Sequence, residues 1–192
     1  MKKNLKYIII GVVLLGLVLG YYFYLSNRKP ATEAEETTTE VSVVKSLLLK
    51  NIQNDYPPTP KEVVKLYAEM TTAFYTENCS DEDFNGLALK IRELYDDELL
   101  AANSEAIYLD RLKAEVNSMK SQGNIISSYS TSSSTDVDFF SQDGFKFARL
   151  NVAFTIKNGI NVGLTKETFL LRKDSKGHWK IYGWVLAKED EN

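Results

Sequence analysis

Residues 150–164 read LNVAFTIKNGINVGL, and this stretch decides the fold of the chain. Over 150–156 apolar side chains alternate with polar or small ones, which is the period of a strand with one face on a core. Asn158 and Gly159 form a turn signal, after which 160–164 repeats the alternation. We therefore expect a β-hairpin whose inner face carries the apolar side chains Leu150, Val152, Phe154, Ile156, Ile160, Val162 and Leu164.

Further strands flank this hairpin in the sequence. Residues 168–173 and 178–186 have strand-like composition and are joined by a loop that contains Gly177. Residues 125–132 and 137–140 are weaker candidates ahead of the hairpin. Together these segments predict about five or six antiparallel strands.

Helical signals precede the strands. Thr59 is a helix N-cap with Pro60 at the first helical position, and Ser80 and Ser104 begin two more helices. Each start is followed by apolar residues at helical spacing. Because helices and strands are segregated along the chain, the pattern predicts an α+β domain over 57–192, with about three helices packed on a curved antiparallel sheet.

The final predicted hairpin, residues 170–184, reads LLRKDSKGHWKIYGW and carries a Gly turn followed by Trp179, Lys180 and Ile181. With the helices before it, this arrangement resembles the nuclear transport factor 2-like, cystatin-like cone superfamily. The resemblance implies helices and a sheet that enclose a pocket, which ketosteroid isomerase-like members use for acid–base chemistry. No residue here matches their catalytic groups, and the apolar inner rows predict a filled core.

An uncharged stretch of nineteen residues occupies 7–25. As a helix it would be about 28 Å long, close to a bilayer core of about 30 Å. Lysines before it and a run of aromatic residues at its end predict a membrane helix with residues 1–6 in the cytoplasm and the domain outside. A cleaved signal peptide is the alternative, although it would end in small residues. The predicted aromatic belt consists of Tyr21, Tyr22, Phe23 and Tyr24.

The sequence thus predicts the lipid bilayer as a partner, contacted by residues 7–25. Gly16 and Gly20 form a GxxxG pattern that would allow a homodimer, although glycine is also common in membrane helices. Residues 26–40 predict an acidic disordered stalk, and 41–56 an amphipathic connecting segment. This order, followed by YPPTPKEVVKLY, also resembles a group of single-pass surface proteins of Gram-positive bacteria, which implies a cell-surface location.

Composition argues against several classes of function. The chain has 23 Lys and Arg against 26 Asp and Glu, a net charge of −3, and this balance excludes a basic nucleic-acid binder. One Cys and one His leave no intramolecular disulfide and no multi-imidazole metal site. We therefore predict no catalytic residue, no cofactor and no metal.

Individual polar residues receive structural interpretations. His178 is interpreted as a solvent-facing strand residue, and Cys79 as a small residue at a helix junction. Asp96, Asp97 and Glu98 form a carboxylate run, interpreted as a solvated helix end rather than a calcium site, since consecutive helical residues point in different directions.

Both faces of the last predicted strand are apolar. Tyr182, Trp184 and Leu186 alternate with a second apolar set, so either residues 41–52 or a partner protein would cover one face. The leading hypothesis is a non-catalytic interaction or scaffold domain anchored at the bacterial cell surface. A small-molecule-binding or enzymatic cone pocket is the alternative, and a subunit of a secretion or envelope assembly is a further one.

Overall fold

Caps and apolar stripes divide the first half of the domain into helices. The computed structural model describes residues 42–187. Thr59 Oγ1 accepts a hydrogen bond from the Glu62 N–H, and Ser80 Oγ accepts one from the Asp83 N–H, so these two predicted N-caps are confirmed. Ser104 precedes α6 as predicted, but its side chain makes no capping hydrogen bond. The helices are α2 (Val43–Leu49), α3 (Pro60–Thr76), α4 (Asp81–Arg92), α5 (Asp97–Ala102) and α6 (Glu105–Ser121).

The second half of the domain forms one antiparallel sheet. Its strands are β1 (Asn124–Thr131), β2 (Asp138–Gln142), β3 (Phe145–Asn158), β4 (Asn161–Lys173) and β5 (Trp179–Leu186). The order is β1-β3-β4-β5, and β2 pairs with the first part of β3 while β1 pairs with its last part. A turn at Asp143 and Gly144, both with positive φ, joins β2 to β3.

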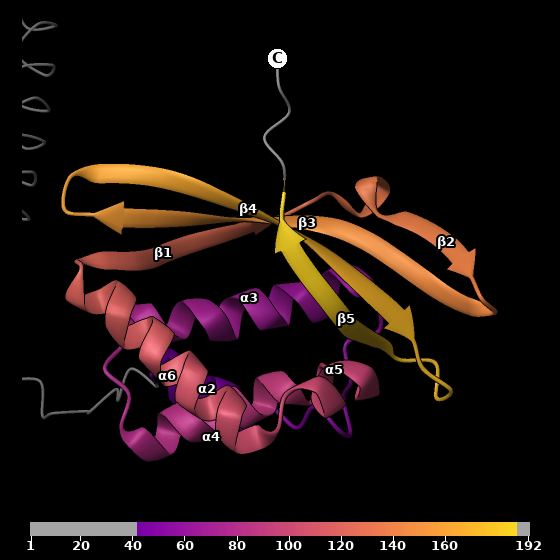
Figure 1. The fold of residues 1–192 in the computed structure, drawn as a ribbon, viewed down its shortest axis with the longest axis horizontal. Helices are drawn as coiled ribbons and strands as arrows, with labels where there is room; N and C mark the ends of the chain where they lie inside the picture. The colour runs from indigo at the N-terminus through magenta and orange to yellow at the C-terminus, as the bar shows by residue number, and fades with distance from the viewer. Residues whose placement is uncertain (1–41, 188–192) are drawn as a thin grey trace, which may run out of the picture. The chain divides into compact units, whose positions relative to one another are not determined.

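The core lies between the helices and one face of the sheet. The α-helices α2 to α6 lie on the same side of the sheet, and α3 runs along it (Figure 1). The buried sheet residues are every second residue of β3 and β4, which confirms the strand period read from the sequence. The central side chains from the sheet are Ala148, Leu150, Val152, Phe169, Leu171 and Ile181.

The inner face of β4 differs from the prediction. Ile160, Val162 and Leu164 are exposed to 98%, 62% and 75%, so their assignment to the inner row is wrong. The reason is the two-residue turn at Gly159 and Ile160: it pairs even-numbered residues of β3 with odd-numbered residues of β4, and directly paired residues share a face. The inner residues of β4 are therefore Thr165, Glu167, Phe169 and Leu171, in a single strand rather than two.

The predicted fold class also needs correction. It combined a membrane-spanning helix with about three further helices, whereas residues 42–187 form five α-helices and a five-stranded sheet. None of the helices among these residues has the length and apolar character to cross a bilayer. The predicted spanning segment at 7–25, with Gly16, Gly20 and the aromatic belt, lies outside the described residues. The fold shown is α+β.

The buried and exposed apolar residues of the hairpin predict opposite responses to truncation. Phe169→Ala should lower the free energy of unfolding by about 3–5 kcal/mol, because Phe169 is fully buried and its removal leaves a cavity. Ile160→Ala should change it by less than about 0.5 kcal/mol. Urea unfolding followed by tryptophan fluorescence checks both values; equal losses would contradict the observed register.

Candidate functional site

A cavity of about 430 Å³ lies between α3, α6 and the inner face of the sheet. Tyr67, Thr71 and Tyr75 reach it from successive turns of α3, because residues four apart share a helix face. Strands β1, β3, β4 and β5 supply its other wall. The lining side chains from α6 are Tyr108, Arg111, Leu112, Glu115 and Met119, and those from the sheet are Ile126, Phe154, Ile156, Thr165, Glu167, Trp184 and Leu186.

Loose packing of α6 leaves the space for this cavity. Val116 is the one buried side chain of α6, whereas α3 buries ten residues along its length. The cavity-facing apolar residues Leu112 and Met119 are only partly buried. The apolar stripe of α6 is therefore not filled by side chains of the sheet opposite, and a gap remains between them.

Aromatic rings form one wall of the cavity. The Trp184 ring stacks on Phe169 at 5.7 Å between centroids, and Tyr67 and Tyr95 lie 5.6 and 5.8 Å from it. Tyr108 meets Tyr95 edge-on at 5.9 Å. These rings hold each other in place, so the wall is a preformed apolar surface.

Glu167 is the acidic side chain that the sheet contributes to the cavity lining. It lies on the inner face of β4, paired with Val152 on one side and Leu186 on the other. Burial, and then the nearby Glu115 carboxylate, raise the pKa of Glu167 to about 7. Within residues 42–187 the Glu167 carboxylate forms no ion pair. It is therefore a half-buried acid that lacks a compensating cation.

The tyrosines around Glu167 stay neutral over the physiological range. Burial raises the pKa of Tyr75 and of Tyr108 to about 12, and the pKa of Tyr67 and of Tyr95 well above the ordinary value. Protonated hydroxyls can both donate and accept hydrogen bonds. The cavity thus combines a rigid aromatic wall, neutral hydroxyls and two carboxyl groups.

The three residues predicted as a partner surface do not share one face. Trp184 and Leu186 line the cavity, whereas Tyr182 lies on the opposite face of the sheet. A register shift explains the difference: Leu171 pairs with Ile181 and Leu170 with Gly183, so Tyr182 is the extra residue of a β-bulge.

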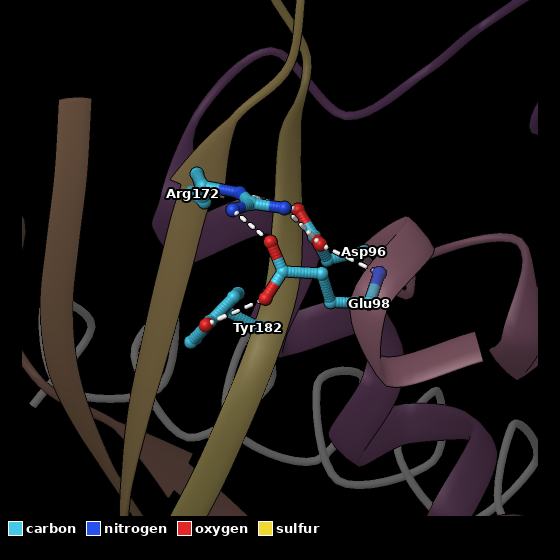
Figure 2. Close-up of polar contacts among 4 residues, drawn as sticks. All are labelled: Asp96, Glu98, Arg172 and Tyr182. Atoms are coloured by element: carbon cyan, nitrogen blue, oxygen red, sulfur yellow. Dashed lines mark hydrogen bonds and ion pairs between the residues drawn. The ribbon is translucent and has the colours of Figure 1, made fainter. Parts of the chain in front are cut away.

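On that outer face, Tyr182 belongs to a polar network with Asp96, Glu98 and Arg172 (Figure 2). Arg172 Nε and Nη2 donate to the two oxygens of Asp96 at 3.0 and 2.5 Å, and Nη1 donates to Glu98 at 2.6 Å. The Tyr182 hydroxyl donates to the other Glu98 oxygen at 2.8 Å. The Arg172 hydrogen bond, followed by that from Tyr182, lowers the pKa of Glu98.

This network attaches the chain before α5 to the edge of the sheet. The Asp96 N–H donates to the Ile181 carbonyl, and the Ile181 N–H donates to the Leu94 carbonyl. The Arg172 guanidinium also lies 4.8 Å from the ring centroids of both Phe145 and Tyr182. Asp96 is only 4% exposed, so its interpretation as part of a solvated helix end is wrong. The role of the network is structural.

The remaining candidates lie elsewhere. His178 stacks on Tyr56 at 4.3 Å in the loop before β5, away from the cavity. Cys79 is partly buried between α3 and α4, and burial raises the pKa of its thiol. In the part of the chain that the structure describes, no group of three or more His, Cys, Asp or Glu side chains is arranged to hold a metal ion.

Sequence reasoning missed the polar part of the cavity. Tyr67, Thr71 and Tyr75 are spaced by four, which puts them on one helix face, but this spacing is equally typical of a filled core. Glu167 is separated from Phe169 and Leu171 by the strand period, so it shares their face. A carboxylate in phase with an apolar row was the available signal.

Removing one partner of the Arg172–Asp96 pair should be costly. Arg172→Met leaves the buried Asp96 carboxylate unpaired, and we expect a loss of about 3 kcal/mol in unfolding free energy. Adding Asp96→Asn should recover part of this loss, because the charge disappears while an oxygen can still cap α5. Chemical denaturation measures both. Lys113→Met, which removes an exposed ion pair with Asp81, is the control. If Lys113→Met lowered the unfolding free energy as much as Arg172→Met does, the Arg172–Asp96 pair would have no special role in stability.

Glu167 should make stability depend on pH. Its pKa is raised from 4.5 to about 7 on folding, so its contribution is complete below pH 4.5 and is lost as the pH rises through about 7. The Glu167→Gln variant lacks this loss. We expect its unfolding free energy, relative to that of the parent protein, to increase between pH 4 and pH 8 in urea titrations. Parallel profiles would show that Glu167 titrates normally.

Comparisons with other proteins place the chain in a family without assigning it a ligand. No curated protein matches the sequence. Residues 1–184 match the family described as Domain of unknown function (DUF6715). This match includes every helix and nearly the whole sheet described above. The chain therefore belongs to the DUF6715 family.

Proposed function

We propose that residues 42–187 form a non-catalytic domain that binds a small molecule in the cavity between α3, α6 and the sheet. The observation that carries this proposal is the cavity itself: about 430 Å³, lined mainly by aromatic and aliphatic side chains with a few convergent polar groups. Small-molecule sites in proteins have this size and composition.

The shape of the lining supports binding of a largely apolar molecule. The Trp184 and Tyr95 rings are fixed by neighbouring rings, and Phe154 and Ile156 continue the apolar surface along β3. A ligand that enters this space would bury apolar surface against side chains that are already ordered, so little conformational entropy would be lost.

Other hollows of the described surface are less suitable. One lies between Pro57 and Glu69 beside α3, and another surrounds His178 and Lys180. Charged side chains make up much of the lining of both. They lack the ring wall that would hold an apolar molecule.

The scaffold role and the cell-surface location inferred from the sequence remain predictions. Of the two large apolar residues expected on a partner surface, Trp184 faces the cavity and packs on Phe169, and Leu186 belongs to the lining although 68% of its surface is exposed. This placement favours a ligand site over a protein interface at β5.

N-phenyl-1-naphthylamine, a neutral apolar dye, provides the test. We expect it to bind residues 42–187 of the intact chain with a dissociation constant of about 1–100 μM and to quench Trp184 by energy transfer. Leu112→Trp should fill the cavity and weaken binding at least about tenfold, whereas Val162→Trp, on the exposed hairpin, should not. Equal binding to both variants would place the dye outside the cavity and contradict the proposal.

A further inference from the structure

Charge is unevenly distributed around the cavity. Glu167 approaches from β4 and Glu115 from α6, and the proximity of Glu115 raises the pKa of Glu167. Arg111 is the cationic side chain of the lining, and it is exposed. In the part of the chain that the structure describes, neither Glu167 nor Glu115 is in an ion pair with it. A positive charge placed between the two carboxyl groups would remove their mutual repulsion.

The aromatic wall favours the same sign of charge. Faces of Trp and Tyr rings carry negative potential and attract cations. This domain already uses the effect at the margin of the cavity, where the Arg92 guanidinium lies 5.2 Å from the Tyr108 ring centroid. Arg92 Nη1 also donates a hydrogen bond to the Asn103 carbonyl at 2.9 Å, and this bond holds the guanidinium in place.

Geometry brings the acid and the rings together. Glu167 pairs with Leu186 across β4 and β5, and the next inner pair along the same strands is Phe169 with Trp184. The Glu167 carboxylate therefore projects from the same face as the Trp184 ring, one inner position away. Tyr67, on α3, lies against Trp184 from the helix side.

We propose that the cavity selects an organic cation, an amine or quaternary ammonium compound, whose charged group lies between Glu167 and the wall formed by Tyr67, Tyr95 and Trp184. This inference rests on the proposed function, since it names the class of ligand for the same cavity. The apolar part of the ligand contacts Phe154, Ile156 and Leu112. An anion meets two carboxyl groups and is disfavoured.

Three probes of similar shape separate charge from size. Acetylcholine carries a positively charged quaternary nitrogen, and 3,3-dimethylbutyl acetate is the neutral ester with a quaternary carbon in its place. The third probe, 4,4-dimethylpentanoate, carries a negative charge. Titration calorimetry at pH 8 should give acetylcholine an affinity at least about tenfold above that of the neutral ester, with the carboxylate weakest. Equal affinities, or no binding of acetylcholine, would overturn the cation assignment.

The naphthylamine dye distinguishes this failure from failure of the proposed function. If the dye binds in the cavity and acetylcholine shows no preference over the ester, the domain binds small molecules but does not select cations. If the dye also fails to bind, both proposals are wrong.

Variants locate the charge recognition. Glu167→Gln should weaken acetylcholine binding about tenfold and leave binding of the neutral ester and the dye unchanged, which also shows that the variant is folded. Glu69→Gln, on the part of α3 that faces Lys50, is the matched control. It should bind acetylcholine, the neutral ester and the dye as the parent does. Loss of ester binding in Glu167→Gln would indicate a structural role and overturn the assignment.

The pH dependence gives an independent readout. The groups that face Glu167 are Glu115 and Arg111 from α6, Tyr67 and Tyr75 from α3, and Tyr95 and Tyr108 across the cavity. The tyrosines stay neutral, and the pKa of Glu167 is about 7. Acetylcholine affinity should therefore rise about fivefold from pH 6 to pH 8 in the parent, because the ionised fraction rises from about one tenth to about nine tenths and the neutral form binds about tenfold more weakly, while ester affinity stays constant. A flat acetylcholine profile would contradict the proposal.

Discussion

The two-residue turn between β3 and β4 is the constraint on which the arrangement of the domain depends. By pairing Asn158 with Asn161, it matches even-numbered residues of β3 with odd-numbered residues of β4. A shift of one residue would turn every β4 side chain to the other face, removing Phe169 and Leu171 from the core. The same parity places Thr165 and Glu167 under the helices and leaves Val162 and Leu164 in solvent. The same turn therefore decides which β4 side chains enter the core and which line the cavity.

A second geometric device separates the cavity from the outer face. The β-bulge at Tyr182 turns Trp184 inward, against Phe169, and leaves Tyr182 beside Arg172. Arg172 can then hold the buried Asp96, which fixes the segment that carries Tyr95. Because Tyr95 is part of the aromatic wall, the polar network on one side of the sheet (Figure 2) supports the geometry of the cavity on the other.

The energetic character of the cavity follows from incomplete packing. If α6 packed against the sheet as closely as α3 does, the Glu167 carboxylate would be fully buried. An isolated ionised carboxylate is costly in an apolar core, so it would then need a buried partner. Instead the open space leaves Glu167 partly exposed, with a pKa near neutrality. A pKa in that range gives the charge of the site a dependence on physiological pH. The proposed cation preference uses this charge together with the rings.

The amino-acid sequence alone determined the α+β class of the domain, which it predicted over 57–192, together with the helix starts at Thr59 and Ser80 and the inner row of β3. Caps and strand period could be read in this way because they depend on neighbouring residues. Local patterns could not decide the inner face of β4, since that depends on how many residues the turn contains. Nor could they show that Asp96 is buried or that Glu167 and Tyr67 share a cavity, because those residues are far apart in the chain. Only tertiary structure brings such groups together, and the register between strands decides which of them meet.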